Sequence, residues 1–240
     1  MKPIVLFTLL LLSHVADASV VMLNTRVIYP SHLPSQAVQF TNNDAIPYVM
    51  QLWTDMNNPA STPDNADGPF VIMPALFRIE PNMGQSARLV YSGKNLRQDR
   101  ESVFYLNTAQ VPPKNILAQT DNQMVVVLRN RVKIFYRPRG IEGTPDEMPN
   151  QLQFSLYLKN DQWMLNVNNP TGYYASIIKA NAVLTNKKVI AFHAEMVPPM
   201  SEMSFTGPKD NIDISSVLDV EFTLINDHGG YTEIKKPFKK

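Results

Sequence analysis

The stretch Met124–Tyr136 has residue types and a spacing suited to binding another protein chain. It begins with five consecutive apolar residues, 124–128, and continues with Arg129, Arg131 and Lys133, which are spaced by two and share one face of a strand. An edge strand with an exposed apolar row is an aggregation hazard unless it serves pairing with another chain. The same pattern is as typical of a strand buried on both faces, so both interpretations stand on the pattern alone.

Strand geometry also predicts which side chains of this stretch face inward. A strand from Met124 to Tyr136 is about twice the usual five or six residues. Side chains of a strand with one solvated face alternate between core and solvent. We expect the side chains at 125 and 127 to face the core of their own domain. Those of Met124, Val126 and Leu128 then point the other way.

The sequence has no recognisable catalytic or metal-binding motif. It contains no Cys, which excludes disulfides and a thiol nucleophile. After the first 18 residues the histidines are His32, His193 and His228, and none has a partner at metal-ligand spacing. The segment 64–68 lacks the downstream glutamate of a calcium loop and is interpreted as an exposed turn. We expect no enzymatic activity, no metal, no cofactor and no small-molecule substrate.

The periodicity of the chain is that of short strands. Apolar runs rich in Val, Ile, Phe and Tyr are bounded by Asn, Asp, Gly or Pro, and no stretch has the spacing of a capped amphipathic helix. The predicted strands are 37–40, 48–53, 87–91, 103–106, 124–136, 152–158, 163–167, 173–184, 189–192 and 217–225. This density predicts an all-β fold of immunoglobulin-like sandwiches.

Length and one Pro- and Gly-rich stretch predict two domains. The chain of 240 residues suits two domains of about 100 each after removal of a leader. The segment 138–149 cannot continue a central strand. We therefore expect an N-terminal domain at 19–137 and a C-terminal domain at 138–240.

The first 18 residues are typical of a signal peptide. Lys2 supplies the positive start, Pro3–Leu12 is apolar but too short to span a bilayer, and Ala16-Asp17-Ala18 is a small-x-small cleavage site. We expect cleavage after Ala18 and a soluble exported protein. The net charge of +1 argues against nucleic acid as a partner.

Several motifs, in order, resemble the PapD-like periplasmic chaperones of the chaperone–usher pilus pathway. The motifs are Asn24–Tyr29, Arg78–Pro81, Gln98–Asn107, Val111–Pro113, Val132–Pro138, Asn168–Tyr174 and Ile225–Gly230. The resemblance covers the whole chain after the leader. It implies two immunoglobulin-like domains set at an angle with a cleft between them. The implied function is to bind, fold and cap pilus subunits by donor-strand complementation and to deliver them to an outer-membrane usher.

The resemblance also assigns roles to single residues. Arg26 and Lys133 match the basic pair that holds the C-terminal carboxylate of the bound subunit. Met124, Val126 and Leu128 match the apolar row that is lent to the open groove of the subunit. A further set matches a charged network that fixes the angle between the domains. Its members are Glu101, Arg137 and Asp227.

Two departures from the family pattern bear on details. Met73-Pro74-Ala75 replaces Thr-Pro-Pro, which leaves a cis bond at Pro74 open. Gly172 stands at a position where the family has proline. The connection from Pro113 to Met124 is short and lacks Cys, as in the branch of the family that builds rod-like pili.

The main alternative is a structural pilin or an adhesin built from similar sandwiches. A pilin needs a free N-terminal extension of alternating apolar residues, whereas Val20–Leu23 leads directly into Thr25-Arg26, which matches the first strand of a chaperone. Self-association of the free protein through its apolar edge is also left open.

Overall fold

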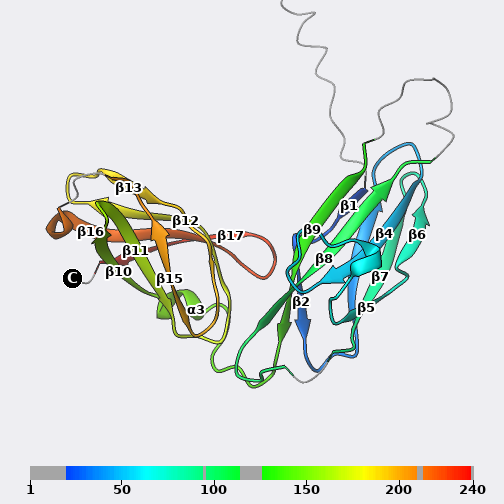
Figure 1. Cartoon of the computed structure of the whole chain (residues 1–240), viewed down its shortest axis with the longest axis horizontal. Coiled ribbons are helices and arrows are strands. Elements are labelled where there is room, and N and C mark those ends of the chain that lie inside the picture. The colour runs from blue at the N-terminus through cyan, green and yellow to red at the C-terminus, as the bar shows by residue number, and fades with distance from the viewer. Residues whose placement is uncertain (1–19, 94–95, 114–125, 210–212, 239–240) are drawn as a thin grey trace, which may run out of the picture.

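The computed structural model describes residues 20–93, 96–113, 126–209 and 213–238, which form two β-sandwiches. Figure 1 shows the strands of the N-terminal sandwich nearly upright, whereas β12 and β17 of the C-terminal sandwich run nearly horizontally, so the two sandwiches are set at an angle. The predicted fold of two immunoglobulin-like domains is confirmed.

The N-terminal sandwich packs a four-stranded sheet, in the order β1-β3-β7-β5, against a five-stranded sheet, in the order β2-β9-β8-β4-β6. Its strands are β1 (Val20–Met22), β2 (Arg26–Pro30), β3 (Gln36–Asn42), β4 (Tyr48–Asp55), β5 (Phe70–Met73), β6 (Leu76–Ile79), β7 (Gly84–Tyr91), β8 (Ser102–Val111) and β9 (Leu128–Arg137); the 3-10 helix η2 (Pro63–Asn65) follows β4.

The C-terminal sandwich packs β10-β11-β15 against β13-β12-β16-β17, with β14 paired to β12. Its elements are α3 (Met148–Gln151), β10 (Gln153–Lys159), β11 (Gln162–Asn169), β12 (Ala175–Leu184), β13 (Val189–Phe192), β14 (Met196–Val197), β15 (Ser201–Thr206), η3 (Ile214–Ser216), β16 (Val217–Ile225) and β17 (Tyr231–Pro237). No helix in the described segments is long and apolar enough to cross a membrane.

Each sandwich has its own core because its strands bury every second residue. In β3, Val38 and Phe40 are buried and the residues beside them are exposed; in β11, Leu165 and Val167 are buried and the residues beside them are half-buried. The two clusters of buried apolar residues are separate. Burial of this kind contributes about 1.5–3 kcal/mol per large side chain and is the main stabilising term of each domain.

The first strands of the chain change sheets, and β2 then pairs with only part of β9. β1 pairs with β3 in the four-stranded sheet, and the chain then crosses so that β2 runs parallel to β9 in the other sheet. The pairing joins Arg26 to Lys133 and ends with Pro30 beside Arg137. β2 therefore covers only the C-terminal half of β9.

The structure settles the Pro74 peptide bond and adds a short helix at the start of the C-terminal domain. The Met73–Pro74 peptide bond is cis. The segment 138–147 is irregular as predicted, but α3 adds one helical turn before β10, which the sequence pattern did not indicate.

Candidate functional site

The N-terminal half of β9 is an open sheet edge. β8 pairs with β9 from Leu128 to Tyr136, whereas β2 pairs with it only from Lys133 to Arg137. Within the described part of the chain, Leu128–Val132 thus has a strand neighbour on one side only. The prediction of an edge strand holds for this half of β9, and the other half lies inside the sheet.

The residues that lead into this edge are apolar and exposed. The exposed fractions of Val126, Val127 and Leu128 are 62%, 50% and 51%. Val126 and Val127 precede the first paired residue of β9, so the strand is shorter than predicted. Met124, Val125 and the short connection after Pro113 lie outside the described residues.

The predicted faces of Val127 and Leu128 are wrong. Leu128 lies directly opposite Gln110, and the unbroken register places it on the same face as Ile134, which is buried in the core. Val127 is exposed rather than packed inward. Leu128 therefore continues the core-facing stripe of β9 past the end of the sandwich, where no described side chain buries it. Arg129, Arg131 and Lys133 share one face, as predicted, and it is the face opposite to Leu128.

Arg26 lies at the start of β2 and reaches into the second domain. Its guanidinium Nη1 donates to Ser176 Oγ at 3.3 Å and to the Ile225 carbonyl at 3.0 Å, and it lies 5.5 Å from the centre of the Phe135 ring. The residue is 8% exposed, and its Nε has no hydrogen-bond partner among the described atoms. Burial lowers the pKa of Arg26, and the carboxylates of Asp227 and Glu101 oppose that shift. A guanidinium stays charged despite such a shift. Arg26 is therefore a buried cation whose Nε–H is free to donate a hydrogen bond.

Lys133 lies beside Arg26 in the parallel register, on the same face of the sheet. Adjacent strands are about 4.8 Å apart, so the two cations are close neighbours. Burial, then the positive charges of Arg26 and Arg131, lower the pKa of Lys133. No acceptor for its ammonium group is present in the described ranges. The structure therefore brings Arg26 and Lys133 together, in a geometry that favours binding of an anion.

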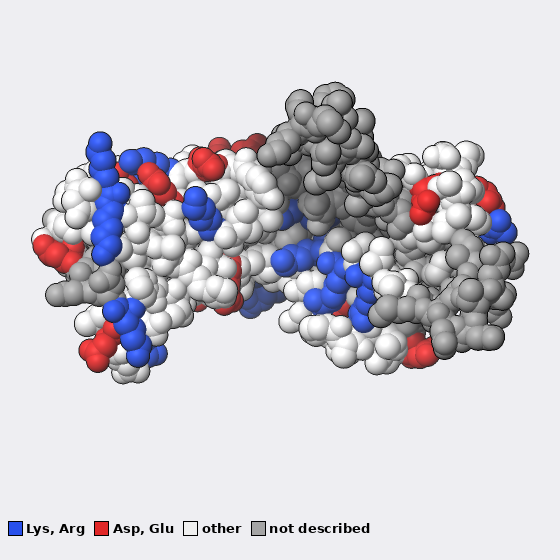
Figure 2. Space-filling view, turned by 90° about the horizontal axis from the view of Figure 1, so that it is seen from above, with Lys and Arg blue, Asp and Glu red and all other residues white. Residues whose placement is uncertain are grey.

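Arg26 lines the cleft between the domains, and Lys133 is its neighbour on β9. A pocket there is lined by Arg26, Phe135 and Arg137 from the first domain and by Tyr174 and Asp227 from the second, among others. Figure 2 shows Lys and Arg side chains gathered where the N-terminal domain faces the hollow between the two domains.

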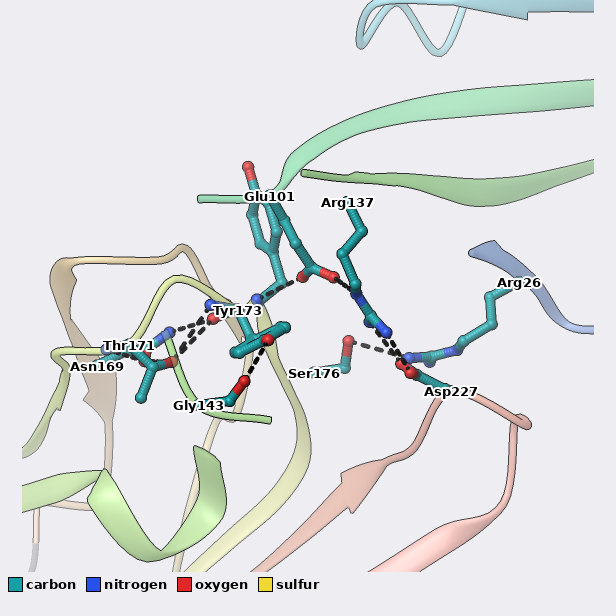
Figure 3. A network of polar contacts seen from close by, with 10 residues as sticks. Arg26, Glu101, Arg137, Gly143, Asn169, Thr171, Tyr173, Ser176 and Asp227 are labelled. Atoms are coloured by element: carbon teal, nitrogen blue, oxygen red, sulfur yellow. Dashed lines mark hydrogen bonds and ion pairs between the residues drawn. The ribbon is translucent and has the colours of Figure 1, made fainter. Parts of the chain in front are cut away.

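Glu101, Arg137 and Asp227 form one network across the domain junction (Figure 3). Arg137 donates to Glu101 Oε1 at 2.7 Å and binds both oxygens of Asp227, at 2.6 and 2.8 Å. Glu101 also accepts from the backbone N–H of Tyr174 at 2.8 Å. Burial opposes the charge on Arg137, but its hydrogen bonds to the two carboxylates raise its pKa. The three residues that the sequence grouped together are thus in direct contact.

The turn between β16 and β17 contributes contacts that the sequence did not indicate. Gly229 has a φ of +82°, a conformation that favours glycine, and a Cβ there would collide with Thr25. The same turn region supplies the Ile225 carbonyl to Arg26, next to Asp227, whose grouping with Arg137 the sequence did predict. Ser176 carried no sequence signal, because its role depends only on how the second domain docks.

Comparisons with known proteins agree with this architecture. Residues 19–142 match the family described as pili and flagellar-assembly chaperone, PapD N-terminal domain, and residues 147–236 match pili assembly chaperone PapD, C-terminal domain. Among curated relatives, the chaperone protein FimB/FhaD of Bordetella pertussis is 34% identical over 229 residues, which cover 92% of this chain and 88% of the relative.

Solved structures give the same result. The crystal structure of the YadV chaperone matches with a TM-score of 0.76 at 31% identity and covers 92% of this chain and 100% of that one. The SafB chaperone of Salmonella enterica, solved in complex with the SafA pilin, matches with a TM-score of 0.73 at 26% identity and covers 94% and 99%. The similar proteins are chaperones rather than pilins, and the chain belongs to the PapD family of pilus-assembly chaperones.

Proposed function

We propose that this protein captures an incomplete pilus subunit by adding the open half of β9 to it. The observation that carries the proposal is the incomplete pairing of β9, which leaves Leu128–Val132 without a second neighbour beside an exposed apolar segment. The family match and the SafB–SafA complex support a pilin as the occupant. Strand addition satisfies the free backbone groups of such an edge and buries its side chains.

The apolar row is the main source of affinity in this proposal. Met124, Val126 and Leu128 would fill a groove in the subunit that lacks one strand of its own. Three side chains of this size contribute about 5–9 kcal/mol before the entropy cost of ordering. Since Leu128 continues the core-facing stripe of β9, the core of the first domain and the completed core of the subunit would form one row along the strand.

Arg26 and Lys133 are proposed to bind the C-terminal carboxylate of the subunit. The buried Nε of Arg26 and the ammonium of Lys133 lack acceptors within the described structure, which supports an anion there. The open edge begins directly beside Lys133. A subunit whose carboxylate lies at Lys133 and whose last strand follows the edge therefore runs parallel to β9.

The remaining assignments complete this proposal. Export would follow cleavage of residues 1–18 after Ala18, supported by a family match that begins at residue 19. The working boundary between the domains is 137/138. No catalysis is involved, since burial supplies the free energy, and an outer-membrane usher would accept the loaded subunit. The Glu101–Arg137–Asp227 network would hold the two domains so that Arg26 faces the edge.

The test of the proposal is how well variants of the basic pair capture a pilus subunit. Lys133→Ala and Arg26→Ala should each lower affinity by at least about 30-fold, because truncating one partner of a partly buried charge pair costs about 2–5 kcal/mol. Capture is measured by recovery of the bound pilin with the chaperone from periplasm and by titration with the purified pilin.

The matched control is Lys235→Ala, which removes an exposed cation on β17. It should leave capture unchanged, and all three variants should keep the circular dichroism spectrum of the parent. Normal capture by both Lys133→Ala and Arg26→Ala would refute the anchor assignment.

The lowered pKa of Lys133 predicts how capture depends on pH. A bound carboxylate would raise this pKa again, so binding favours the protonated amine. Affinity should be highest at pH values below the pKa of Lys133 in the free protein and should fall as pH rises through that pKa. Because the pKa is lowered, this loss begins below the usual lysine value of 10.5. Lys133→Arg should remove this alkaline loss, because a guanidinium does not titrate there. Titrations at neutral and alkaline pH on both proteins decide the point.

A further inference from the structure

The cations on the outer face of β9 offer more than one place for a carboxylate. Arg129, Arg131 and Lys133 are two residues apart, which is about 6.6 Å along a strand. A bound strand that slips by two residues keeps every side chain on its original face. The alternation of side chains alone therefore cannot distinguish a carboxylate bound at Lys133 from one bound at Arg131. A further interaction must determine the register.

Arg131 is already bound by a buried carboxylate from another strand. Asp55, at the end of β4, accepts from Arg131 Nη2 at 2.6 Å and from Arg131 Nε at 3.1 Å. It also accepts from Asn107 Nδ2 at 2.6 Å and from the Asn58 backbone N–H at 2.8 Å. The Asp55 side chain is fully buried, and Arg131 Cζ lies over the Tyr105 ring, 3.4 Å from its centre.

The charge state of Asp55 agrees with this geometry. Burial acts to raise its pKa, but the hydrogen bonds from Arg131, Asn107 and Asn58 together outweigh burial and lower it. The carboxylate is therefore ionised at neutral pH and balances the guanidinium of Arg131.

Arg129 is also held, in a weaker way. Its Nη2 donates to Asn107 Oδ1 at 2.7 Å, and its guanidinium lies 4.9 Å from the centre of the Trp53 ring. Lys133 is the member of the row without an acceptor in the described segments. Of the three cations, Arg131 has its charge balanced by a carboxylate, and Lys133 lies next to Arg26.

We propose that Asp55 is a positioning residue that sets the register of the bound pilin by occupying Arg131. With Arg131 bound, the C-terminal carboxylate of the pilin has its anchor at Lys133 and Arg26, and the slipped register has none. This inference rests on the proposed strand addition. It adds a specificity-determining residue that lies on β4, away from the edge and from the cleft.

Disulfide mapping can measure the register, because the chain has no Cys of its own. Asn130→Cys places one thiol on the open edge, and the pilin that co-purifies with the parent protein carries single cysteines at successive positions of its last strand. A disulfide needs Cα atoms about 4.4–6.8 Å apart, so a shift of two residues changes which position reacts.

Asp55→Asn should move part of the product by two positions. The parent should cross-link at one position of the pilin. The variant should add a second product two residues nearer the C-terminus of the pilin, in a comparable amount, because the carboxylate can then bind Arg131. Asp55→Asn with Arg131→Gln should return to the single parental position, which a merely structural role of Asp55 would not produce.

Each outcome decides between the proposals. A single parental position in Asp55→Asn overturns the inference, and so does a double variant that stays mixed. No preferred position in the parent would refute the anchor at Lys133, and the role of Asp55 with it. If Asp55→Asn does not fold, Arg131→Lys takes its place, because an ammonium group cannot bind the Asp55 carboxylate in the bidentate way of a guanidinium. This variant should show a smaller shift in the same direction. The absence of any shift would overturn the inference.

Discussion

Leu128→Asp should abolish capture of the pilin, and Val127→Asp should leave most of it intact. In a strand-added complex Leu128 enters the groove of the pilin, where a carboxylate loses the hydrophobic term and is buried without a partner. The two losses together amount to at least about 4 kcal/mol, or about a thousandfold in affinity. Val127 is equally apolar and equally exposed in the free protein, but it alternates to the solvent side of an extended strand.

The pair of variants isolates the face of the strand from its general hydrophobicity. Titration of purified pilin against each variant gives the affinities, and circular dichroism checks that both proteins fold. Because neither residue is in the core, we expect unchanged melting temperatures. A greater loss in Val127→Asp than in Leu128→Asp would mean that the bound segment alternates in the opposite sense to β9, and the strand-addition geometry would have to be rebuilt.

The sequence predicted which residues of this stretch bind a partner, but it did not predict which face of β9 packs on the core of its own domain. The two-residue period correctly grouped Arg129, Arg131 and Lys133. The inward direction was wrong because residues 124–128 are all apolar, so the run has no polar position to mark a face. The same ambiguity recurs at Ile134-Phe135-Tyr136. Only the register with β8, which joins Leu106 to Val132 and Phe104 to Ile134, determines which side is buried.

Contacts between segments that are distant in the chain could not be predicted from the sequence, for a related reason. Arg26 was assigned by its motif, but its hydrogen bonds reach residues 150 and 199 positions away, in the other domain. Likewise Asp55 and Arg131 are 76 positions apart. The strand order β9-β8-β4 brings them to one face, and local patterns contain no information on that order. The fold class, by contrast, follows from strand density and turn residues, which are local.

Arg137→Ala should weaken the docking of the two domains by about 3–5 kcal/mol, because it leaves the buried carboxylate of Glu101 without its cation. Calorimetry should show a lower melting temperature, and small-angle scattering should show a broader range of domain separations. Capture of the pilin should also fall, although Arg137 lies outside the open edge. The contacts of Arg26 to Ser176 and Ile225 exist only while the domains are docked.

Two controls separate a buried network from ion pairs in general. Arg78→Ala breaks a pair with Glu80 at 2.8 Å, close to the 2.7 Å of Arg137 and Glu101, but both partners are more than half exposed; it should cost less than about 1 kcal/mol. Arg137→Met combined with Glu101→Gln removes the charges of both Arg137 and Glu101, and it should recover much of the stability lost in Arg137→Ala. An equal cost for Arg78→Ala and Arg137→Ala would argue that the junction is held by something else.

The deficit of Arg137→Ala should also depend on pH. Burial raises the pKa of Glu101 even beside Arg137, and loss of the guanidinium raises it further. A carboxyl whose folded-state pKa lies above its unfolded value stabilises the protein at pH values below the unfolded pKa. That contribution is lost as pH rises through the folded pKa. The difference in melting temperature between parent and variant should therefore be smaller at a pH of about 4–5 than at neutral pH. A difference that does not change with pH would show that Glu101 is not the group left uncompensated.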